Sequence, residues 1–471
     1  MGADRANVAS TEVLGWAPSG RSVFTVRFEE GVVGRLRQMP RRPLMARDLS
    51  AVTVVTACLA LAACASSSAP APRNPTPAAT TASAAPSTPT YDPAEPTGWG
   101  PTVGELDQAR DLVATWTPAQ LAGQVIVARW HGTDPAEVAG MVEELHLAGA
   151  QLTGSNIADE GQVRAVNLAI SEAVARSGRS FPPVIGVDQE GGLVSHLSGV
   201  TTELPAFAEA GRVVSAGAAG STAVTAAMAA AGLELRDLGF TWVFAPVADV
   251  TIGSADVTIG SRSPSDDPAV AARTVAAAVR GFDEAGLVST PKHFPGHGSA
   301  TADSHQTLPV IGASLNELRQ RDLLPFVAAV AAGAPAVMVG HLDMTALAPG
   351  VPASLSPQTY DLLRSDLGFE GVAITDSLGM GGVMAWESPA VEALKAGADL
   401  MLMPADTRLA HEQLTAAIAA GVVPRERALQ AAAQVVAVQL WQQRVAAATP
   451  VPADAAEQAA ARVQEMLAIA P

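Results

Sequence analysis

Eight short apolar runs alternate with alanine-rich stretches of helical periodicity from about residue 104 onward. The runs are continuously apolar, as parallel strands that are buried on both faces require. The repeat of strand then helix predicts an α/β fold, a (β/α)8 barrel of the TIM type, in a single domain at 104–449. A doubly wound open sheet is the alternative that the pattern leaves open. The predicted strands are Gln124–Ala128, Gly149–Thr153, Val184–Asp188, Trp242–Val247, Leu287–Lys292, Ala336–Gly340, Val372–Asp376 and Asp399–Met403.

Helical periodicity between these runs is clear at Pro268–Glu284 and Leu315–Ala332. Asp267 and Pro268 open the first segment as an N-cap followed by proline at the first helical position. A further helix is expected within the C-terminal segment 450–471, on the outside of the barrel.

Polar and ionisable residues stand where five of the apolar runs stop. In a barrel these strand ends meet on one rim, which is where barrel enzymes carry out their chemistry. One such residue is easily a strand-capping accident, whereas five strands that end this way predict a site. The residues are Asp188-Gln189-Glu190, Asp249, Lys292-His293, His341 and Asp376.

The N-terminal part reads as a secretion signal with a start at Met39 or Met45. An arginine-rich region precedes an apolar stretch of roughly 15 residues, which is short for a membrane span. The stretch ends in Leu-Ala-Ala-Cys64, which resembles a bacterial lipobox. We therefore predict an upstream segment and lipoprotein signal peptide at 1–63, with Cys64 lipidated. An uncleaved anchor helix is the alternative, and both place the body at the extracytoplasmic face of the cell membrane.

Residues 64–103 are rich in Ala, Pro, Ser and Thr and hold few large apolar side chains. Such a segment cannot bury enough surface to offset the entropy of ordering it. It is predicted to be a disordered tether, so that the lipid anchor is the only membrane contact.

Charge and cysteine content exclude several classes of protein. The formal net charge is −17, which argues against a nucleic-acid partner and against general adhesion to anionic lipid. The two cysteines, Cys58 and Cys64, both precede the barrel, so a disulfide framework and a Cys nucleophile are excluded there. No motif for a nucleotide or redox cofactor occurs, and a monomer is expected.

Three of the eight histidines fall in Lys292–Gly298 and the Asp303-Ser304-His305 triplet that follows it. One interpretation is a metal site that combines these histidines with Asp303. A proline and a glycine interrupt the helix that the His-x3-His spacing needs, and no glutamate accompanies it. No metal is therefore predicted.

The second interpretation of this segment is an Asp303–His305 dyad. In an extended loop, residues i and i+2 point to the same side, so the carboxylate can orient the imidazole and stabilise its charged form. A protonated histidine is a competent acid near neutral pH and can return as a base. The alternative is that Asp303 merely caps a turn.

Asp376 ends the seventh predicted strand, where a carboxylate is rigidly held and can be aimed at the anomeric carbon of a sugar. Retaining glycosidases place a nucleophile and an acid/base on opposite sides of the scissile bond and form a covalent glycosyl-enzyme. A histidine in place of the usual second carboxylate does not repel an incoming anion once it is neutral. Phosphate can then replace water as the acceptor.

Five stretches, in order along the chain, resemble family 3 glycoside hydrolases, specifically the β-N-acetylglucosaminidase branch in its single-domain bacterial lipoprotein form. The resemblance covers about residues 105–445, and the Lys-His-Phe-Pro-Gly-His-Gly block with its Asp-Ser-His is highly specific. The stretches are Asp188–Gly192, Phe244–Val250, Lys292–Gly298, Asp303–His305 and Thr375–Met380.

The resemblance implies a retaining exo-β-N-acetylglucosaminidase that removes terminal β-linked N-acetylglucosamine from peptidoglycan fragments without a cofactor. Asp376 would be the nucleophile, His305 the acid/base and Asp303 its orienter. The substrate-binding residues it implies are Asp188, His196, Arg262, Lys292, His293 and His341. An ordinary loop cation is the alternative for Arg262, and a packed, hydrogen-bonded strand-end histidine is the alternative for His341.

Three positions depart from the family pattern. Leu193 and His196 stand where arginines are common, so a ligand contact is shortened to imidazole. Ser377 stands where a second aspartate is frequent, which removes a charge beside Asp376. The residues after Asp376 must complete the barrel, so the α/β sandwich domain that donates the acid in many family 3 enzymes is expected to be absent.

Three alternative functions remain open at this point. A phosphorolytic variant would release N-acetylglucosamine 1-phosphate, and assays with and without phosphate distinguish it. A β-glucosidase or β-xylosidase would be revealed by parallel assays on chromogenic sugars. An inactive sugar-binding lipoprotein would bind the ligand without turnover.

Overall fold

The computed structural model describes residues 12–15, 24–27, 92–256 and 258–469. Strands β1 (Glu12–Gly15) and β2 (Phe24–Arg27) form a two-stranded sheet of their own. The predicted lipidation site, Cys64, and most of the predicted signal peptide and tether lie outside the described residues.

Five parallel strands form the largest sheet, in the order β13-β3-β4-β5-β8. All of them are buried along their whole length, which explains why they read as continuous apolar runs. A second parallel pair joins β10 (Ala336–Val339) to β12 (Val372–Thr375). The strands of the larger sheet are β3 (Ile126–Ala128), β4 (Gly149–Leu152), β5 (Val184–Val187), β8 (Trp242–Val243) and β13 (Met401–Leu402).

Single parallel bridges connect these two sheets on both sides. Trp242 pairs with Val288 and Val247 with Lys292, so the segment 288–294 lies beside β8. Phe294 then pairs with Val339 of β10, and Ile374 of β12 pairs with Leu400, just before β13. The parallel pairings thus curl the strands in a TIM-like α/β arrangement, as the sequence predicts, rather than in an open doubly wound sheet.

Prolines shorten two of the predicted strands. Trp242–Val247 is a regular strand only as far as Val243, and Leu287–Lys292 takes part only through bridges. Proline cannot donate a ladder hydrogen bond, and Pro246, Pro291 and Pro295 all fall in this part of the sheet. The polar residues that follow are therefore carried by irregular backbone.

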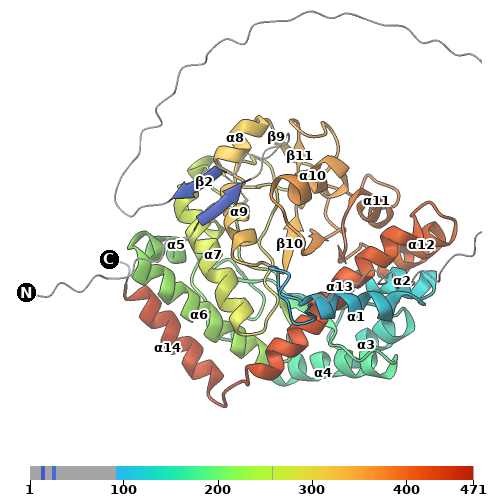
Figure 1. The fold of residues 1–471 in the computed structure, drawn as a ribbon. Helices are drawn as coiled ribbons and strands as arrows, with labels where there is room; N and C mark the ends of the chain where they lie inside the picture. The colour runs from blue at the N-terminus through green and yellow to red at the C-terminus, as the bar shows by residue number, and fades with distance from the viewer. Residues whose placement is uncertain (1–11, 16–23, 28–91, 257, 470–471) are drawn as a thin grey trace, which may run out of the picture. The chain divides into compact units, whose positions relative to one another are not determined.

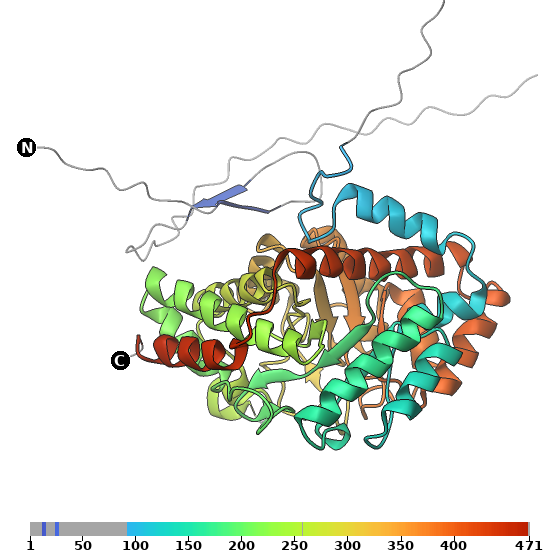
Figure 2. The same cartoon turned by 90° about the horizontal axis from the view of Figure 1, so that it is seen from below.

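Helices surround the strands, and α13 runs across the end of the barrel where α1 also lies (Figures 1 and 2). The predicted helix Leu315–Ala332 is two helices, because Pro325 cannot continue the turn that ends near Arg321. The helices are α1 (Val103–Val113), α2 (Pro118–Gln124), α3 (Pro135–Glu144), α4 (Glu160–Arg176), α5 (Phe207–Ser215), α6 (Ala218–Asp237), α7 (Pro268–Glu284), α8 (Leu315–Gln320), α9 (Leu324–Ala331), α10 (Pro357–Asp361), α11 (Pro389–Ala396), α12 (Thr407–Ala419), α13 (Arg425–Ala448) and α14 (Ala455–Leu467).

Helix α6 is long and apolar enough to cross a membrane by length and composition alone. Half of that apolar window is buried in this structure, where α6 packs against α5, α7 and α14. Its apolar character is accounted for by this packing.

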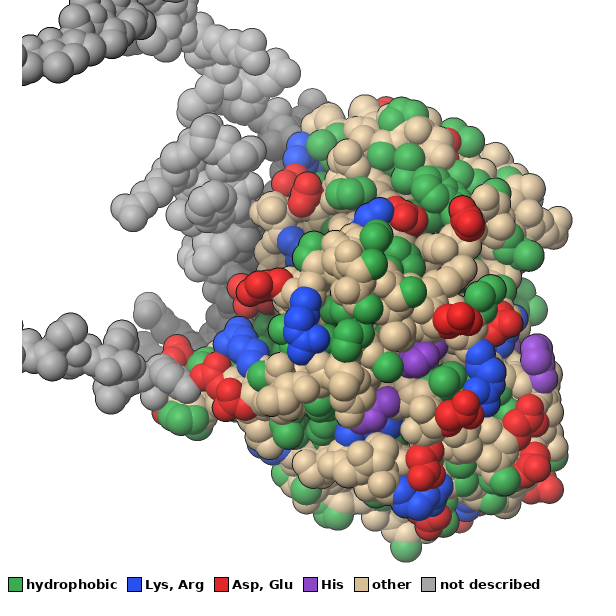
Figure 3. Space-filling model, turned by 90° about the vertical axis from the view of Figure 1, so that its right-hand side faces the viewer, with side chains coloured by type: hydrophobic (Ala, Val, Ile, Leu, Met, Phe, Trp, Pro, Cys, Tyr) green, Lys and Arg blue, Asp and Glu red, His purple; other side chains and the backbone are tan. Residues whose placement is uncertain are grey.

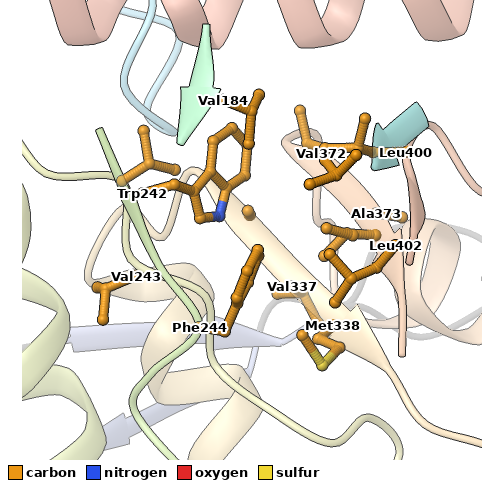
Figure 4. Close-up of a cluster of buried hydrophobic side chains, with 14 of the residues drawn as sticks. Val184, Trp242, Val243, Phe244, Val337, Met338, Val372, Ala373, Leu400 and Leu402 are labelled. Atoms are coloured by element: carbon orange, nitrogen blue, oxygen red, sulfur yellow. The ribbon is translucent and has the colours of Figure 1, made fainter. Parts of the chain in front are cut away.

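Apolar side chains from the strands fill the inside of the barrel (Figure 4). Trp242 and Phe244 are the largest of them that the figure shows, and the Trp242 indole donates to the Thr290 hydroxyl at 2.6 Å. Gly186 of β5 leaves room for the Phe244 ring, since a Cβ there would lie 2.5 Å from a ring carbon. This filled interior supports the rim above it.

Candidate active site

A cavity of about 390 Å³ opens at the end of the barrel where the parallel strands terminate. Its walls come from loops after most of the strands, so residues far apart in sequence meet there. Seven of the side chains that the sequence predicts line it, namely Asp188, His196, Arg262, Lys292, His293, His305 and Asp376. Asp303 contacts His305 from outside this lining, and His341 lies behind it.

The protein surface shows no broad region of one charge on the face drawn in Figure 3. Basic, acidic and histidine side chains are interspersed there among neutral ones. Neither sign of charge dominates this face.

Two cations and two carboxylates alternate along one wall of the cavity. Lys292 forms ion pairs with Asp188 and with Glu190, the latter at 2.6 Å. Arg262 donates to the Glu190 carboxylate from Nε and from Nη2, at 2.8 and 2.9 Å. The two positive and two negative charges of this cluster compensate one another. Asp188 is partly exposed and faces the cavity.

The charges of this cluster depend on one another. Burial alone would raise the pKa of Glu190, but Lys292 and Arg262 together lower it to about 2. Burial would likewise lower the pKa of Lys292, whereas Asp188 and Glu190 raise it above its usual value. Glu190 and Lys292 are thus ionised because of their neighbours, and removal of either leaves an uncompensated buried charge.

Asp249 positions the histidines of the Lys292–Gly298 segment. One carboxylate oxygen accepts the backbone N–H groups of His293 and His297, at 3.1 and 2.7 Å. The other lies 2.7 Å from Nδ1 of His293, and because a carboxylate only accepts, that nitrogen carries the proton. Nε2 of His293 is then left for a ligand in the cavity.

Asp376 follows β12 directly and is almost wholly buried. Its Oδ1 accepts the N–H of Ser377 at 2.7 Å. Burial would raise the pKa of Asp376, but the nearby His293 and His341 rings, the Ser377 N–H and Lys292 hold it below its usual value. The group is therefore a carboxylate at neutral pH, as a nucleophile must be.

His341 is buried and hydrogen-bonded on both ring nitrogens. Nε2 lies 2.9 Å from the Ser377 carbonyl oxygen and so donates, while Nδ1 lies 2.7 Å from the Ser354 hydroxyl. Burial lowers the pKa of His341. His341 supports the backbone after Asp376 and is not among the residues that line the cavity, which agrees with the alternative of a packed, hydrogen-bonded strand-end histidine.

The Asp303–His305 pair lies in an exposed loop at the cavity mouth. Oδ1 of Asp303 is 2.9 Å from Nδ1 of His305 and also accepts the His305 backbone N–H at 2.9 Å. Asp303 thus orients the ring and caps the turn at once, which joins the two interpretations of its role. The His305 side chain is 64% exposed.

Two glycines fasten this loop to the loop that follows Asp376. The N–H of Gly381 donates to the His305 carbonyl at 3.0 Å, and that of Gly382 donates to the Ser304 carbonyl at 3.1 Å. A Cβ at 381 would lie 2.4 Å from the Gln306 carbonyl oxygen. Ser304 is further held by Nε2 of His297 at 2.9 Å.

His196 lies on the loop after β5, next to the hairpin of β6 (Gln189–Gly191) and β7 (Val194–Ser195). The ring is close to Gly154, on the loop after β4, and lines the cavity. Leu193, at the hairpin turn, is 84% exposed. Of these two departures from the family pattern, only His196 is placed to contact a ligand in the cavity.

Three charged residues of the site had no role assigned from the sequence: Glu190, Asp249 and Arg129. Glu190 and Asp249 both stand in the polar stretches at strand ends, and Arg129 directly follows β3 in the same way. Their position was a signal, but only the folded structure shows which charge each one meets. Within the described residues, no three His, Cys, Asp or Glu side chains are grouped as a metal site.

Known proteins resemble this chain in sequence and in structure. The profile of the glycosyl hydrolase family 3 N-terminal domain matches residues 108–438. A β-hexosaminidase of Stenotrophomonas maltophilia is 39% identical over 266 residues, which is 55% of this chain and 76% of the relative. Against β-hexosaminidase A of Pseudoalteromonas piscicida the identity is 33% over 58% of this chain, and the matched region spans about half (48%) of that relative.

A solved structure gives the same picture. The family 3 β-N-acetylglucosaminidase of Paenibacillus sp. superposes with a TM-score of 0.69 at 31% identity. The match covers 76% of this chain and 69% of the other.

Proposed function

Because this chain belongs to glycosyl hydrolase family 3, we propose that it is a retaining exo-β-N-acetylglucosaminidase with Asp376 as nucleophile and His305 as general acid/base. The observation that carries the proposal is that a buried, ionised Asp376 and an Asp303-held His305 line one cavity of sugar size. The membership makes the chain a glycoside hydrolase, and the residue roles are what we add.

The first step needs the carboxylate and the protonated imidazole together. Asp376 attacks the anomeric carbon, and the bond from that carbon to the leaving oxygen breaks. His305 gives its proton to this oxygen, so the aglycone departs as a neutral alcohol. The sugar is then held on Asp376 as an ester, and His305 is neutral.

The second step reverses these roles. Neutral His305 takes a proton from water, whose oxygen attacks the anomeric carbon and releases Asp376 as a carboxylate. Asp303 keeps its own charge and stabilises the imidazolium: burial would raise the pKa of Asp303, but hydrogen bonds from His305 hold it below its usual value. Two inversions at the same carbon give net retention.

The ion-paired wall supports the specificity for the sugar. Asp188 accepts from sugar hydroxyls, Lys292 and Arg262 donate to neighbouring ones, and His293 accepts through Nε2. These side chains are held by one another before substrate arrives, so little ordering cost is left for binding. His196 contributes from the same loop after β5 that carries Asp188 and Glu190.

We further propose that the substrate is a peptidoglycan fragment with a terminal β-linked N-acetylglucosamine. In this proposal residues 1–63 carry a lipoprotein signal and Cys64 is acylated, which places the barrel at the extracytoplasmic face of the membrane, and the barrel works there as a monomer. The curated relatives named above are β-hexosaminidases, which supports the sugar class.

Parallel assays test this function. Purified protein is compared on 4-nitrophenyl β-N-acetylglucosaminide, β-glucoside and β-xyloside, and on a muropeptide, with and without phosphate. We expect turnover of the first substrate and the muropeptide, release of free N-acetylglucosamine with retained β configuration, and none from Asp376→Asn. Full activity of Asp376→Asn, or a preference for glucoside, would contradict the assignment.

A further inference from the structure

Arg129 brings a third cation into the cavity, from the end of β3. It follows β3 directly, and its backbone is fixed by Thr407, whose hydroxyl accepts the Arg129 N–H and donates to its carbonyl, both at 3.0 Å. The side chain lines the cavity beside Ser377, the neighbour of Asp376.

The Arg129 guanidinium meets a neutral partner and no carboxylate. Nη2 donates to the Ser377 hydroxyl at 2.9 Å, and within residues 92–256 and 258–469 no carboxylate lies within ion-pair distance. Nε is buried without a hydrogen-bond partner, and burial lowers the pKa of the group. A charge that is half removed from water without a counter-ion is costly, so its presence here calls for a ligand.

The surroundings are shaped around this guanidinium. A Cβ at Gly379 would lie 2.5 Å from Nη2 of Arg129, so the guanidinium in its present position packs directly against the backbone of the loop after Asp376. The charges of Lys292 and Arg262, by contrast, are paired with those of Asp188 and Glu190. Of the three cations that line the cavity, Arg129 is the one without a carboxylate partner in the described part of the chain.

The charge balance changes during the proposed reaction. Three cations and three carboxylates line the free cavity, leaving its histidines aside. When Asp376 carries the sugar as an ester, its negative charge disappears from beside Ser377 and Arg129, while the matching positive charge disappears from His305 at the cavity mouth, so the positive charge of Arg129 is locally uncompensated. An anion is then attracted next to the reacting carbon.

We infer that Arg129 and Ser377 form a binding subsite for an oxyanion, a carboxylate or a phosphate, beside the nucleophile. A guanidinium fork with a neighbouring hydroxyl offers the donors that such a group accepts. The oxyanion is either an acidic substituent of the substrate or free phosphate. The inference rests on the proposed function for the position of the sugar, while anion binding itself is measured without turnover.

Calorimetric titration with inorganic phosphate is the first arm. Full-length wild type is compared with Arg129→Gln, Arg129→Lys and Ser377→Asp, the last of which supplies an internal carboxylate to Arg129. Arg273→Gln, an exposed position on α7, is the matched control. The second arm measures KM for N-acetylglucosaminyl-N-acetylmuramic acid and for diacetylchitobiose, which lacks the carboxylate.

We expect Arg129→Gln and Ser377→Asp to raise either the Kd for phosphate or the KM for the acidic disaccharide by about tenfold or more, as loss of a charge-assisted hydrogen bond does. Arg129→Lys should have an intermediate effect, and Arg273→Gln should leave both values unchanged. A loss of phosphate affinity identifies free phosphate as the ligand. A higher KM for the muramic acid substrate alone identifies a substrate carboxylate.

The inference would be overturned if Arg129→Gln and Ser377→Asp kept the wild-type Kd for phosphate and the wild-type KM for the acidic disaccharide. It would also be overturned if the wild-type protein neither bound phosphate nor preferred the acidic disaccharide. Activity retained by Asp376→Asn would reject the proposed function. The phosphate titration would still test the anion subsite, because it needs no turnover.

Discussion

The N–H of Gly381 donates to the carbonyl oxygen of His305, at 3.0 Å. This bond ties the loop of the acid/base to the loop of the nucleophile, which is far along the chain, so the two groups hold one spacing across the cavity. Retaining chemistry depends on that spacing, because both groups act on the same bond.

Gly381→Ala tests this tie. The added Cβ would lie 2.4 Å from the Gln306 carbonyl oxygen, so the His305 loop must shift. We expect kcat to fall about tenfold or more on substrates with poor leaving groups, since small misplacements of a catalytic group are costly. The matched control is Gly312→Ala, where a Cβ meets nothing within 4 Å. Equal kcat values for the two variants across leaving groups would refute the tie.

Asp376→Asn should lose essentially all turnover, because a neutral amide cannot form the glycosyl ester. The substitution keeps the shape of the side chain and removes a buried charge, so the protein should remain folded. Steady-state rates and circular dichroism on the same sample separate the two effects. Loss of folded signal together with activity would leave stability as the cause.

His305→Ala should lower kcat/KM by a factor of about 10²–10⁴ on poor leaving groups and by less on 4-nitrophenol, which departs without protonation. Asp303→Ala should cost less, since it removes the orienting bond at 2.9 Å and leaves the proton carrier. The measurement is how kcat/KM depends on leaving-group pKa in wild type, His305→Ala and Asp303→Ala. The same dependence in all three would argue against His305 as the acid.

Glu190→Gln should destabilise the fold by about 3–5 kcal/mol, because it leaves buried Lys292 and Arg262 with less opposing charge. Urea unfolding at neutral pH measures this free energy. The control is Glu465→Gln on α14, because Glu465 pairs with Arg462 at the surface, where an ion pair contributes little. Equal unfolding free energies for the two variants would show that the buried cluster does not depend on Glu190.

The same carboxylate predicts how stability depends on pH. The folded pKa of Glu190, about 2, lies below its usual 4.5, so the unfolded chain binds the proton first as pH falls. Its contribution is therefore present above about pH 4.5 and lost progressively toward pH 2. Urea midpoints between these pH values should fall more steeply for wild type than for Glu190→Gln. Parallel profiles would mean that Glu190 is not the group responsible.

Local patterns in the sequence predicted the strand positions and the helix Pro268–Glu284, because periodicity, caps and prolines act within a few residues. The segment at Leu315–Ala332 was predicted as one helix, although Pro325 divides it. The family resemblance added the roles of Asp376 and His305, which stay predictions.

The pairing of charges could not be read from the chain and follows from the fold. The residue pattern already showed that polar residues stand at the strand ends, because an apolar run ends where the chain leaves the buried interior. The folded barrel then paired Glu190 with Arg262, turned His341 away from the cavity and left Arg129 beside a serine. These pairings join residues up to 248 positions apart, and no local pattern encodes the distance between two atoms on different strands.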